Sequence, residues 1–142
     1  RYVKEKGEFD YIMPKTIEKN PKLKEKFEEF ILNTSNLYQE FIEAGIPAED
    51  ARSILPNAAA SSLVASLNLR ELIHLANLRL CTRAQLEIRM LVKAMVDEVI
   101  KKEPWLKPYL VPKCERLGYC DEDKSCGKMP VKDELLKTVQ TV

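Results

Sequence analysis

The sequence has 142 residues, which is enough chain for one hydrophobic core. Apolar residues make up 45% and charged residues 32%, the proportions of an ordinary soluble globular protein. The net charge of +1 argues against a general nucleic-acid-binding surface, and no apolar run approaches the ~20 residues of a membrane span. We therefore expect neither nucleic acid nor a membrane among the partners.

No secretory signal is visible, and the chain begins at Arg1 rather than at Met. We therefore expect a cytoplasmic protein, and we expect this chain to be one part of it, after either removal of an N-terminal segment or isolation of part of a longer sequence. The four cysteines do not have the density of a secreted disulfide framework, so we expect them to be reduced.

The composition favours helices, because the chain has only four glycines and many Glu, Lys and Leu residues. One exception is expected near the N-terminus. There Phe9, Tyr11 and Met13 fall on one face of an alternating pattern over residues 8–13, and Pro14 stops it. This pattern predicts a short strand or extended arm.

A long helix is predicted next. Asn20 can cap its start, Pro21 suits its first position, and Gly45 suits its end. The opposite face is rich in Lys and Glu, so the apolar stripe is expected to be core rather than a cofactor site. The stripe consists of Leu23, Phe27, Phe30, Ile31, Leu37, Tyr38, Phe41 and Ile42.

Two shorter helices are expected to follow. Pro47 opens the first, over residues 48–55, which must end before Pro56. Asn57 can cap the second, over residues 58–66. Its many Ala and Ser residues would let another helix or a ligand approach closely.

Two helix starts follow in quick succession. Asn68 with Glu71 and Thr82 with Gln85 both have the spacing of a capping box. The predicted helices run from residue 69 to about 80 and from 83 to about 101. The expected core-facing residues are Leu69, Leu72, Ile73, Ala76 and Leu80 in the first helix, and Ala84, Ile88, Leu91, Val92, Met95 and Val99 in the second.

Polar side chains mark the first of these two helices. Arg70, His74 and Asn77 share one stripe, because they fall at i, i+4 and i+7. Arg79 falls on the flank of the apolar face, where a half-buried guanidinium needs an anionic or hydrogen-bond-accepting partner. For Arg79 the alternative to a bound ligand is a structural ion pair, and for His74 it is an ordinary solvated side chain. Candidate partners for the ion pair are Glu71, Glu87 and Asp50.

The second of these helices ends in two lysines, which suit a helix C-terminus. Beyond it, Trp105 and Tyr109 are expected to pack back on the core. Residues 131–142 are expected to form a short helix or to fray.

Three cysteines lie in the C-terminal part, Cys114, Cys120 and Cys126, at a C-x5-C-x5-C spacing. A structural zinc site usually shows closer pairs and needs a fourth ligand, which Cys81 could supply if the tail folds back on it. We therefore favour free thiols and predict no metal site.

Several short motifs occur in the order that they have in one enzyme family. They are Arg1-Tyr2, Ala51-Arg52-x-x-Leu55-Pro56, Asn68-x-Arg70, Leu78-Arg79 and Ala84-Gln85-x-Glu87-Ile88. In this order they resemble the C-terminal half of the flavin-dependent thymidylate synthases, over about residues 1–110. The Arg-His-Arg signature of that family would stand upstream of Arg1, so we expect the chain by itself to lack part of the active site and to be inactive.

The resemblance implies a fold and a reaction. The chain would be mainly α, the helical part of an α+β fold with a short N-terminal strand. Residues 1–110 would belong to the catalytic domain, and residues 111–142 would be a cysteine-containing extension. The implied reaction methylates dUMP to dTMP, with methylenetetrahydrofolate as carbon donor, NADPH as reductant and FAD as cofactor. Members of the family are homotetramers whose subunits share the active site.

The resemblance also implies residue roles. Arg79 would be catalytic and would bind dUMP together with Arg1 and Arg52. The residues at FAD-contacting positions would be Asn68, Leu69, Arg70 and His74. Two other classes of protein stay open at this point: a non-catalytic helical module that binds a protein partner, and a small metal-binding domain built on the cysteines.

Overall fold

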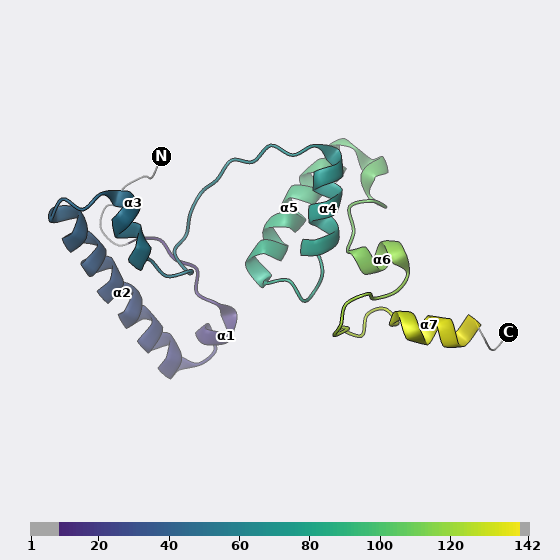
Figure 1. Cartoon of the computed structure of the whole chain (residues 1–142), viewed down its shortest axis with the longest axis horizontal. Helices are drawn as coiled ribbons and strands as arrows, with labels where there is room; N and C mark the ends of the chain where they lie inside the picture. Colours follow the sequence, from purple (N-terminus) through teal and green to yellow (C-terminus); the bar gives the residue numbers. More distant parts are fainter. Residues whose placement is uncertain (1–8, 140–142) are drawn as a thin grey trace. The chain divides into compact units, whose positions relative to one another are not determined.

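The structure is a computed structural model that describes residues 9–139, and these residues are mainly helical, as predicted (Figure 1). The chain divides into two compact units, with the boundary between Val64 and Ala65. Arg1 and Glu8 lie outside the described residues. The first unit contains α1 (Lys15–Glu18), α2 (Pro21–Glu43), α3 (Ala48–Ala51) and the 3-10 turn η1 (Arg52–Ile54). The second contains α4 (Leu69–Arg79), α5 (Leu86–Lys102), the 3-10 turn η2 (Pro104–Leu106), α6 (Lys113–Leu117) and α7 (Lys132–Val139).

Helix α2 begins and ends at the predicted signals. The Asn20 side-chain oxygen accepts the Leu23 backbone N–H at 3.3 Å, and Gly45 follows the helix with a φ of 82°. The buried face is narrower than predicted, because Leu23, Phe30 and Leu37 are exposed. The residues that α2 buries are Ile31, Thr34, Ser35 and Tyr38.

Replacing Asn20 with Ala removes the acceptor that caps α2. We expect the free energy of unfolding to fall by about 1 kcal/mol, the usual cost of losing such a cap. Asn20→Asp keeps a side-chain oxygen in the same place and should retain most of that free energy. Chemical denaturation followed by far-UV circular dichroism measures both variants, and equal losses would contradict the capping role.

The segment before α4 corrects one prediction. Residues 60–68 form no regular element, so the helix predicted over 58–66 is absent. Leu63 and Val64 are exposed, and a lone nine-residue helix that buries nothing is marginal in water, since isolated helices need ~12–15 residues. Backbone pairing replaces it: the Ile12 N–H donates to the Ala58 carbonyl at 2.9 Å, and the Ala60 N–H donates to the Asp10 carbonyl at 2.7 Å.

The predicted N-terminal strand is not shown. Within residues 9–139 this pairing amounts to an isolated antiparallel bridge between Tyr11 and Ala59. Phe9 is buried and Met13 half-buried, whereas Tyr11, on the same predicted face, is exposed. The predicted helix over 48–55 is present as α3 continued by η1, and Ala51 between them is buried.

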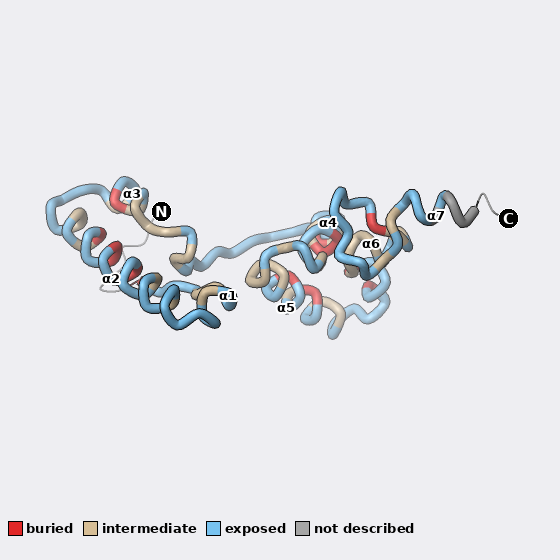
Figure 2. Tube along the Cα trace, turned by 90° about the horizontal axis from the view of Figure 1, so that it is seen from below, coloured by how far each residue is buried: buried red, intermediate tan, exposed pale blue. Residues whose placement is uncertain are grey.

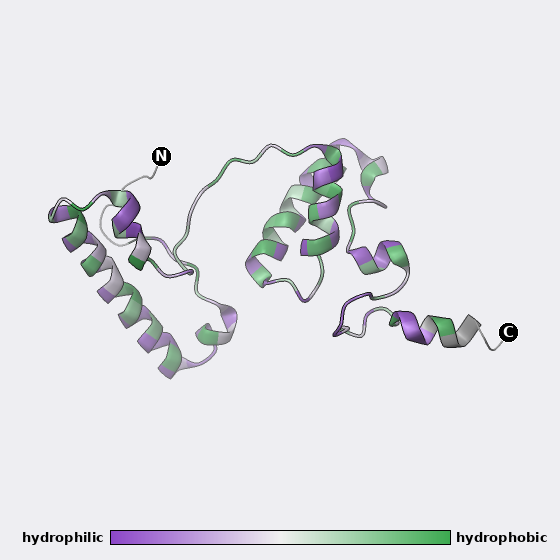
Figure 3. Ribbon diagram, viewed as in Figure 1, coloured by the Kyte–Doolittle hydropathy of each residue, from purple (hydrophilic) through white to green (hydrophobic). Residues whose placement is uncertain are grey.

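The core of the second unit lies between α4, α5 and η2. Figure 2 shows buried residues on α4 and α5, and Figure 3 shows hydrophobic and hydrophilic residues alternating along both helices. Several residues differ from prediction. Leu69, Leu91, Trp105 and Tyr109 were expected in the core but are exposed, whereas Val96, which was not among the predicted core residues, is buried. The core cluster consists of Leu72, Ala76, Val92, Val96, Leu106 and Leu110.

Helix α5 starts later than predicted. Gln85 precedes its first residue, and Thr82 belongs to a turn in which the Ala84 N–H donates to the Cys81 carbonyl at 3.0 Å. Thr82 is therefore not the cap of α5; its carbonyl accepts a hydrogen bond from the Arg89 side chain at 2.8 Å. In the described part of the chain, no helix has the length and apolar character needed to cross a membrane.

Candidate functional site

The start of α4 presents three of the predicted site residues together. The Asn68 side-chain oxygen accepts the Glu71 N–H at 3.0 Å, which confirms the predicted cap and fixes where the helix begins. Leu69 and Arg70 follow directly, and both are exposed. The N-terminus of this 11-residue helix with an Arg on its first turn suits an anionic ligand group, because backbone N–H groups and the guanidinium then act together.

Arg70 and His74 are exposed on the same stripe of α4, but Asn77 is not. Asn77 is only 6% exposed, and its side-chain amide donates to the Ile73 carbonyl at 2.6 Å. Asn77 keeps the predicted i+7 position, but it is not part of the exposed stripe, because its amide back-bonds to the preceding turn and is buried. Among residues 9–139, neither Arg70 nor His74 has a side-chain hydrogen bond or ion pair.

Arg79 is the last residue of α4, and its side chain is exposed rather than half-buried. The described residues form ion pairs elsewhere, but Arg79 takes part in none of them, and its guanidinium has no hydrogen-bond partner within 9–139. The structural ion pair that was one alternative is therefore not formed within that range. The position suits a cation, because it faces the negative end of the helix dipole. A guanidinium without an internal partner is available to a ligand.

Arg52 belongs to the first unit. It is half-buried in η1 and lines a pocket of about 240 Å³ together with Phe9, Pro56 and Asn57. Arg1, the third predicted dUMP ligand, lies outside the described residues. The structure therefore gathers Asn68, Leu69, Arg70, His74 and Arg79 on one helix, and describes Arg52 in its own unit.

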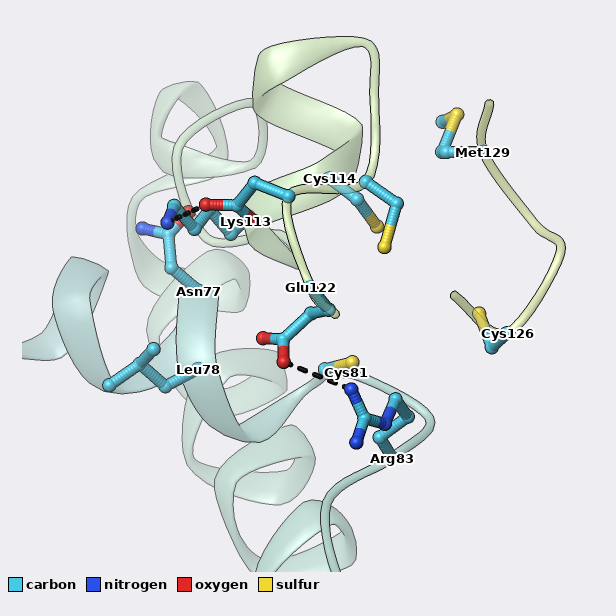
Figure 4. Close-up of a pocket in the computed structure, with 11 residues that line it drawn as sticks. Asn77, Leu78, Cys81, Arg83, Lys113, Cys114, Glu122, Cys126 and Met129 are labelled. Carbon is cyan, nitrogen blue, oxygen red and sulfur yellow. Dashed lines mark hydrogen bonds and ion pairs between the residues drawn. The ribbon is translucent and has the colours of Figure 1, made fainter. Parts of the chain in front are cut away.

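A second feature of the second unit corresponds to an alternative that the sequence left open, in which the tail folds back on Cys81. All four cysteines line one pocket, to which Asn77 and Met129 also contribute (Figure 4). Exposed ion pairs flank it: Arg83 to Glu122 at 3.1 Å, and Lys113 to Asp121. The members of the cluster are Cys81, Cys114, Cys120 and Cys126. The spacing of three cysteines in the tail was visible in the sequence, but their meeting with Cys81 depends on how the tail folds.

The thiols in this pocket have different environments. Burial raises the pKa of Cys114 above its ordinary value, and the neighbouring Cys81 adds to that effect. The pKa of Cys126 is lowered, chiefly by a hydrogen bond with the Thr82 side chain and also by the Lys128 backbone N–H. The hydroxyl that the sequence suggested as a helix cap is thus engaged with a thiol.

Comparison with known proteins identifies the family. The sequence model described as "Thymidylate synthase complementing protein" matches residues 1–105. The chain belongs to this family. It is 43% identical to a flavin-dependent thymidylate synthase of Thermococcus onnurineus over 118 residues, which are 79% of this chain and 47% of that protein.

Two further relatives carry the same name. The protein of Pyrococcus abyssi is 43% identical over 131 residues, covering 86% of this chain and 53% of the relative. That of Nitratidesulfovibrio vulgaris is 38% identical over 145 residues, covering 95% and 59%. The chain thus spans about half the length of the curated relatives it matches. The matched region 1–105 includes Arg52, Asn68 and all of α4.

Proposed function

We propose that the protein containing this chain is a flavin-dependent thymidylate synthase, which methylates dUMP to dTMP with methylenetetrahydrofolate as carbon donor and NADPH as reductant. The family match supports the reaction. The observation on this chain that carries the proposal is α4, which presents Arg70, His74 and Arg79 to solvent without internal partners in residues 9–139. Three unpaired basic or titratable side chains on one helix favour an anionic ligand over an internal structural role.

Arg79 would act on the pyrimidine. Transfer of a one-carbon group to C5 requires an electron-rich ring, and loss of the N3 proton increases the electron density of the ring. A guanidinium within a few ångströms lowers the pKa of such an acid by ~1–3 units, and Arg stays charged at any working pH. The planar fork also matches the planar edge of the pyrimidine better than a lysine would. Arg79 would therefore both bind dUMP and hold its reactive form.

The N-terminal end of α4 would bind FAD. Asn68, Leu69, Arg70 and His74 are exposed over the first two turns of α4, and the helix N-terminus with Arg70 fits the negative charge of a pyrophosphate. These residues therefore fit the cofactor. When bound, the flavin supplies reducing equivalents from NADPH, and the chain contributes position and electrostatics.

The remaining dUMP contacts would come from residues outside α4. Arg52 and Arg1 would contact dUMP, since a bidentate guanidinium suits its phosphate. The assembly would be a cytoplasmic homotetramer with the active site shared among subunits, without nucleic acid or membrane. Residues 1–110 would be catalytic, residues 111–142 an extension, and the 142 residues alone would not turn over dUMP.

The alternative class is a helical protein-interaction module, whose arginines would bridge partners and would bind no flavin.

The direct test uses the full-length gene product. We expect a yellow protein that oxidises NADPH only when dUMP and methylenetetrahydrofolate are both present, and that forms dTMP. Flavin absorbance, NADPH consumption and product chromatography give independent readings. A colourless full-length protein without dUMP-dependent turnover, after reconstitution with FAD, would rule out the enzyme and favour the interaction module.

Replacing Arg70 with Ala should weaken FAD binding by about tenfold or more, since a hydrogen bond to a charged group contributes about 1.5–3 kcal/mol. Arg70 has no side-chain partner among residues 9–139, so its loss should not change the fold. Flavin titration of the full-length apoprotein measures the change. Lys93→Ala, which removes an exposed cation of α5, is the control and should bind FAD normally. Equal weakening in both variants would contradict a role specific to Arg70.

A further inference from the structure

Every cysteine of the chain reaches the same pocket. The sequence contains four, and the pocket is lined by all four. They come from separate places: Cys81 follows α4, Cys114 belongs to α6, and Cys120 and Cys126 lie beyond it. Figure 4 shows the labelled Cys81, Cys114 and Cys126 on separate segments around the pocket. Four thiols in one place match the ligand set of a closed structural zinc site.

The segment that carries three of these thiols has little else to hold it. Between residues 111 and 134, Cys120 is the single buried residue. The Arg83–Glu122 ion pair joins the segment to the connection between α4 and α5, and the Lys113–Asp121 pair lies within the segment; both pairs are exposed, and such pairs contribute about 0–1 kcal/mol each. Segments too small to form a core are usually held by a disulfide framework or a structural metal ion.

Charged side chains and hydrogen-bond donors surround the thiols. Four thiolates around Zn²⁺ carry a net charge of −2. Arg83 and Lys113 line this pocket, where they are paired with Glu122 and Asp121, and Lys128 and Glu115 line the adjoining one. The Cys126 sulfur accepts hydrogen bonds from Thr82 and from the Lys128 backbone, the kind of outer-shell contact that orients a metal ligand. Gly127, with a φ of 80°, lets the chain turn directly after Cys126.

We propose that Cys81, Cys114, Cys120 and Cys126 together bind one structural zinc ion, which fastens residues 111–131 to the connection between α4 and α5. Within residues 9–139 no group of three or more such side chains is arranged to hold a metal ion, so the proposed site requires the four thiols to move closer together when the ion binds. Residues 121–128, Cys126 among them, are all exposed, so no buried contact fixes the position of Cys126. Each thiol that is still protonated releases its proton to solvent on binding.

This zinc site goes beyond the proposed function, and zinc binding can be measured independently of dTMP formation. A set of four protein sulfurs leaves no open position for substrate, so the ion supports the fold rather than the reaction. Metal content and cobalt spectra report on the site whether or not the protein makes dTMP. The two proposals can therefore fail separately.

The test begins with the full-length gene product, exposed to Zn²⁺ under reducing conditions and then freed of loose metal. We expect one zinc per chain by elemental analysis, and four thiols that react with a thiol reagent only after the metal is chelated. Substitution with Co²⁺ should give the visible bands of tetrahedral cobalt and a near-ultraviolet thiolate-to-cobalt transition. A metal-free protein with four reactive thiols, or one with disulfides after purification, overturns the proposal.

Variants define the ligand set. Each single Cys→Ser change should weaken zinc binding by more than the ~10–100-fold cost of losing an outer-shell contact. Met129→Leu removes the other sulfur that lines the pocket and should leave the zinc content at one per chain. Unchanged affinity in any Cys→Ser variant, or zinc loss in Met129→Leu, overturns the four-thiolate site. If a serine variant does not fold, the thiol count and cobalt spectrum of the unaltered protein still decide.

Discussion

Replacing Arg79 with Ala in the full-length protein should lower kcat for dTMP formation by about 10²–10³-fold, the usual cost of removing one group that stabilises developing charge. FAD binding should be retained, because the proposed flavin-contacting residues lie toward the other end of α4. The measurements are flavin content and dUMP-dependent NADPH oxidation. A variant that keeps the flavin and loses turnover separates the pyrimidine-binding role from the cofactor-binding role.

The structure indicates that Arg79→Ala should affect turnover without affecting stability. Arg79 is exposed and has no side-chain partner within residues 9–139, so its removal breaks no described contact. The free energy of unfolding should therefore change by no more than ~0.5 kcal/mol, as for an ordinary surface residue. Loss of turnover together with a large loss of stability would contradict this assignment and favour a structural role.

Two control variants sharpen the result. Arg79→Lys keeps the charge but loses the planar fork, and its turnover should fall between those of the unaltered protein and Arg79→Ala. Arg116→Ala removes another exposed arginine of the second unit, on α6, and should keep full activity. Turnover by Arg79→Ala equal to that of Arg116→Ala would exclude Arg79 from the reaction.

Local signals predicted where α2 and α4 begin. Asn20 and Asn68 are both confirmed as caps, because a cap depends on a hydrogen bond between residues three positions apart. Thr82 shows the limit of this reasoning. It has the same local signature, yet α5 begins at Leu86, and the Thr82 side chain interacts with Cys126. The sequence does not reveal that Thr82 interacts with a residue more than forty positions away.

The other differences also come from contacts between distant segments. The helix predicted over residues 58–66 is replaced by backbone pairing of Ala58 and Ala60 with residues near Tyr11. Trp105 and Tyr109 were predicted to pack back on the core, but Leu106 and Leu110 are buried instead. The convergence of the cysteines is the largest such case. Motif spacing within one segment could not show that three thiols of the tail approach a fourth beyond α4.

Truncating Leu106 to Ala should be among the most damaging single changes in the second unit. Leu106 is 4% exposed and contacts the core cluster formed with α4 and α5. A Leu→Ala change at such a site costs about 2–5 kcal/mol, from lost burial and the cavity left behind, out of a total stability of about 5–15 kcal/mol for a typical protein.

The effect of Leu106→Ala on function follows from where the leucine packs. Helix α4 carries the proposed site, and its buried residues Leu72 and Ala76 share a core with Leu106. We therefore expect a lower urea midpoint and earlier flavin release on heating, with kcat at low temperature nearly unchanged, because no ligand contact is removed. Leu63→Ala is the matched control: Leu63 is 77% exposed, so its midpoint should shift little. Equal midpoints for the two variants would show that this core does not support α4.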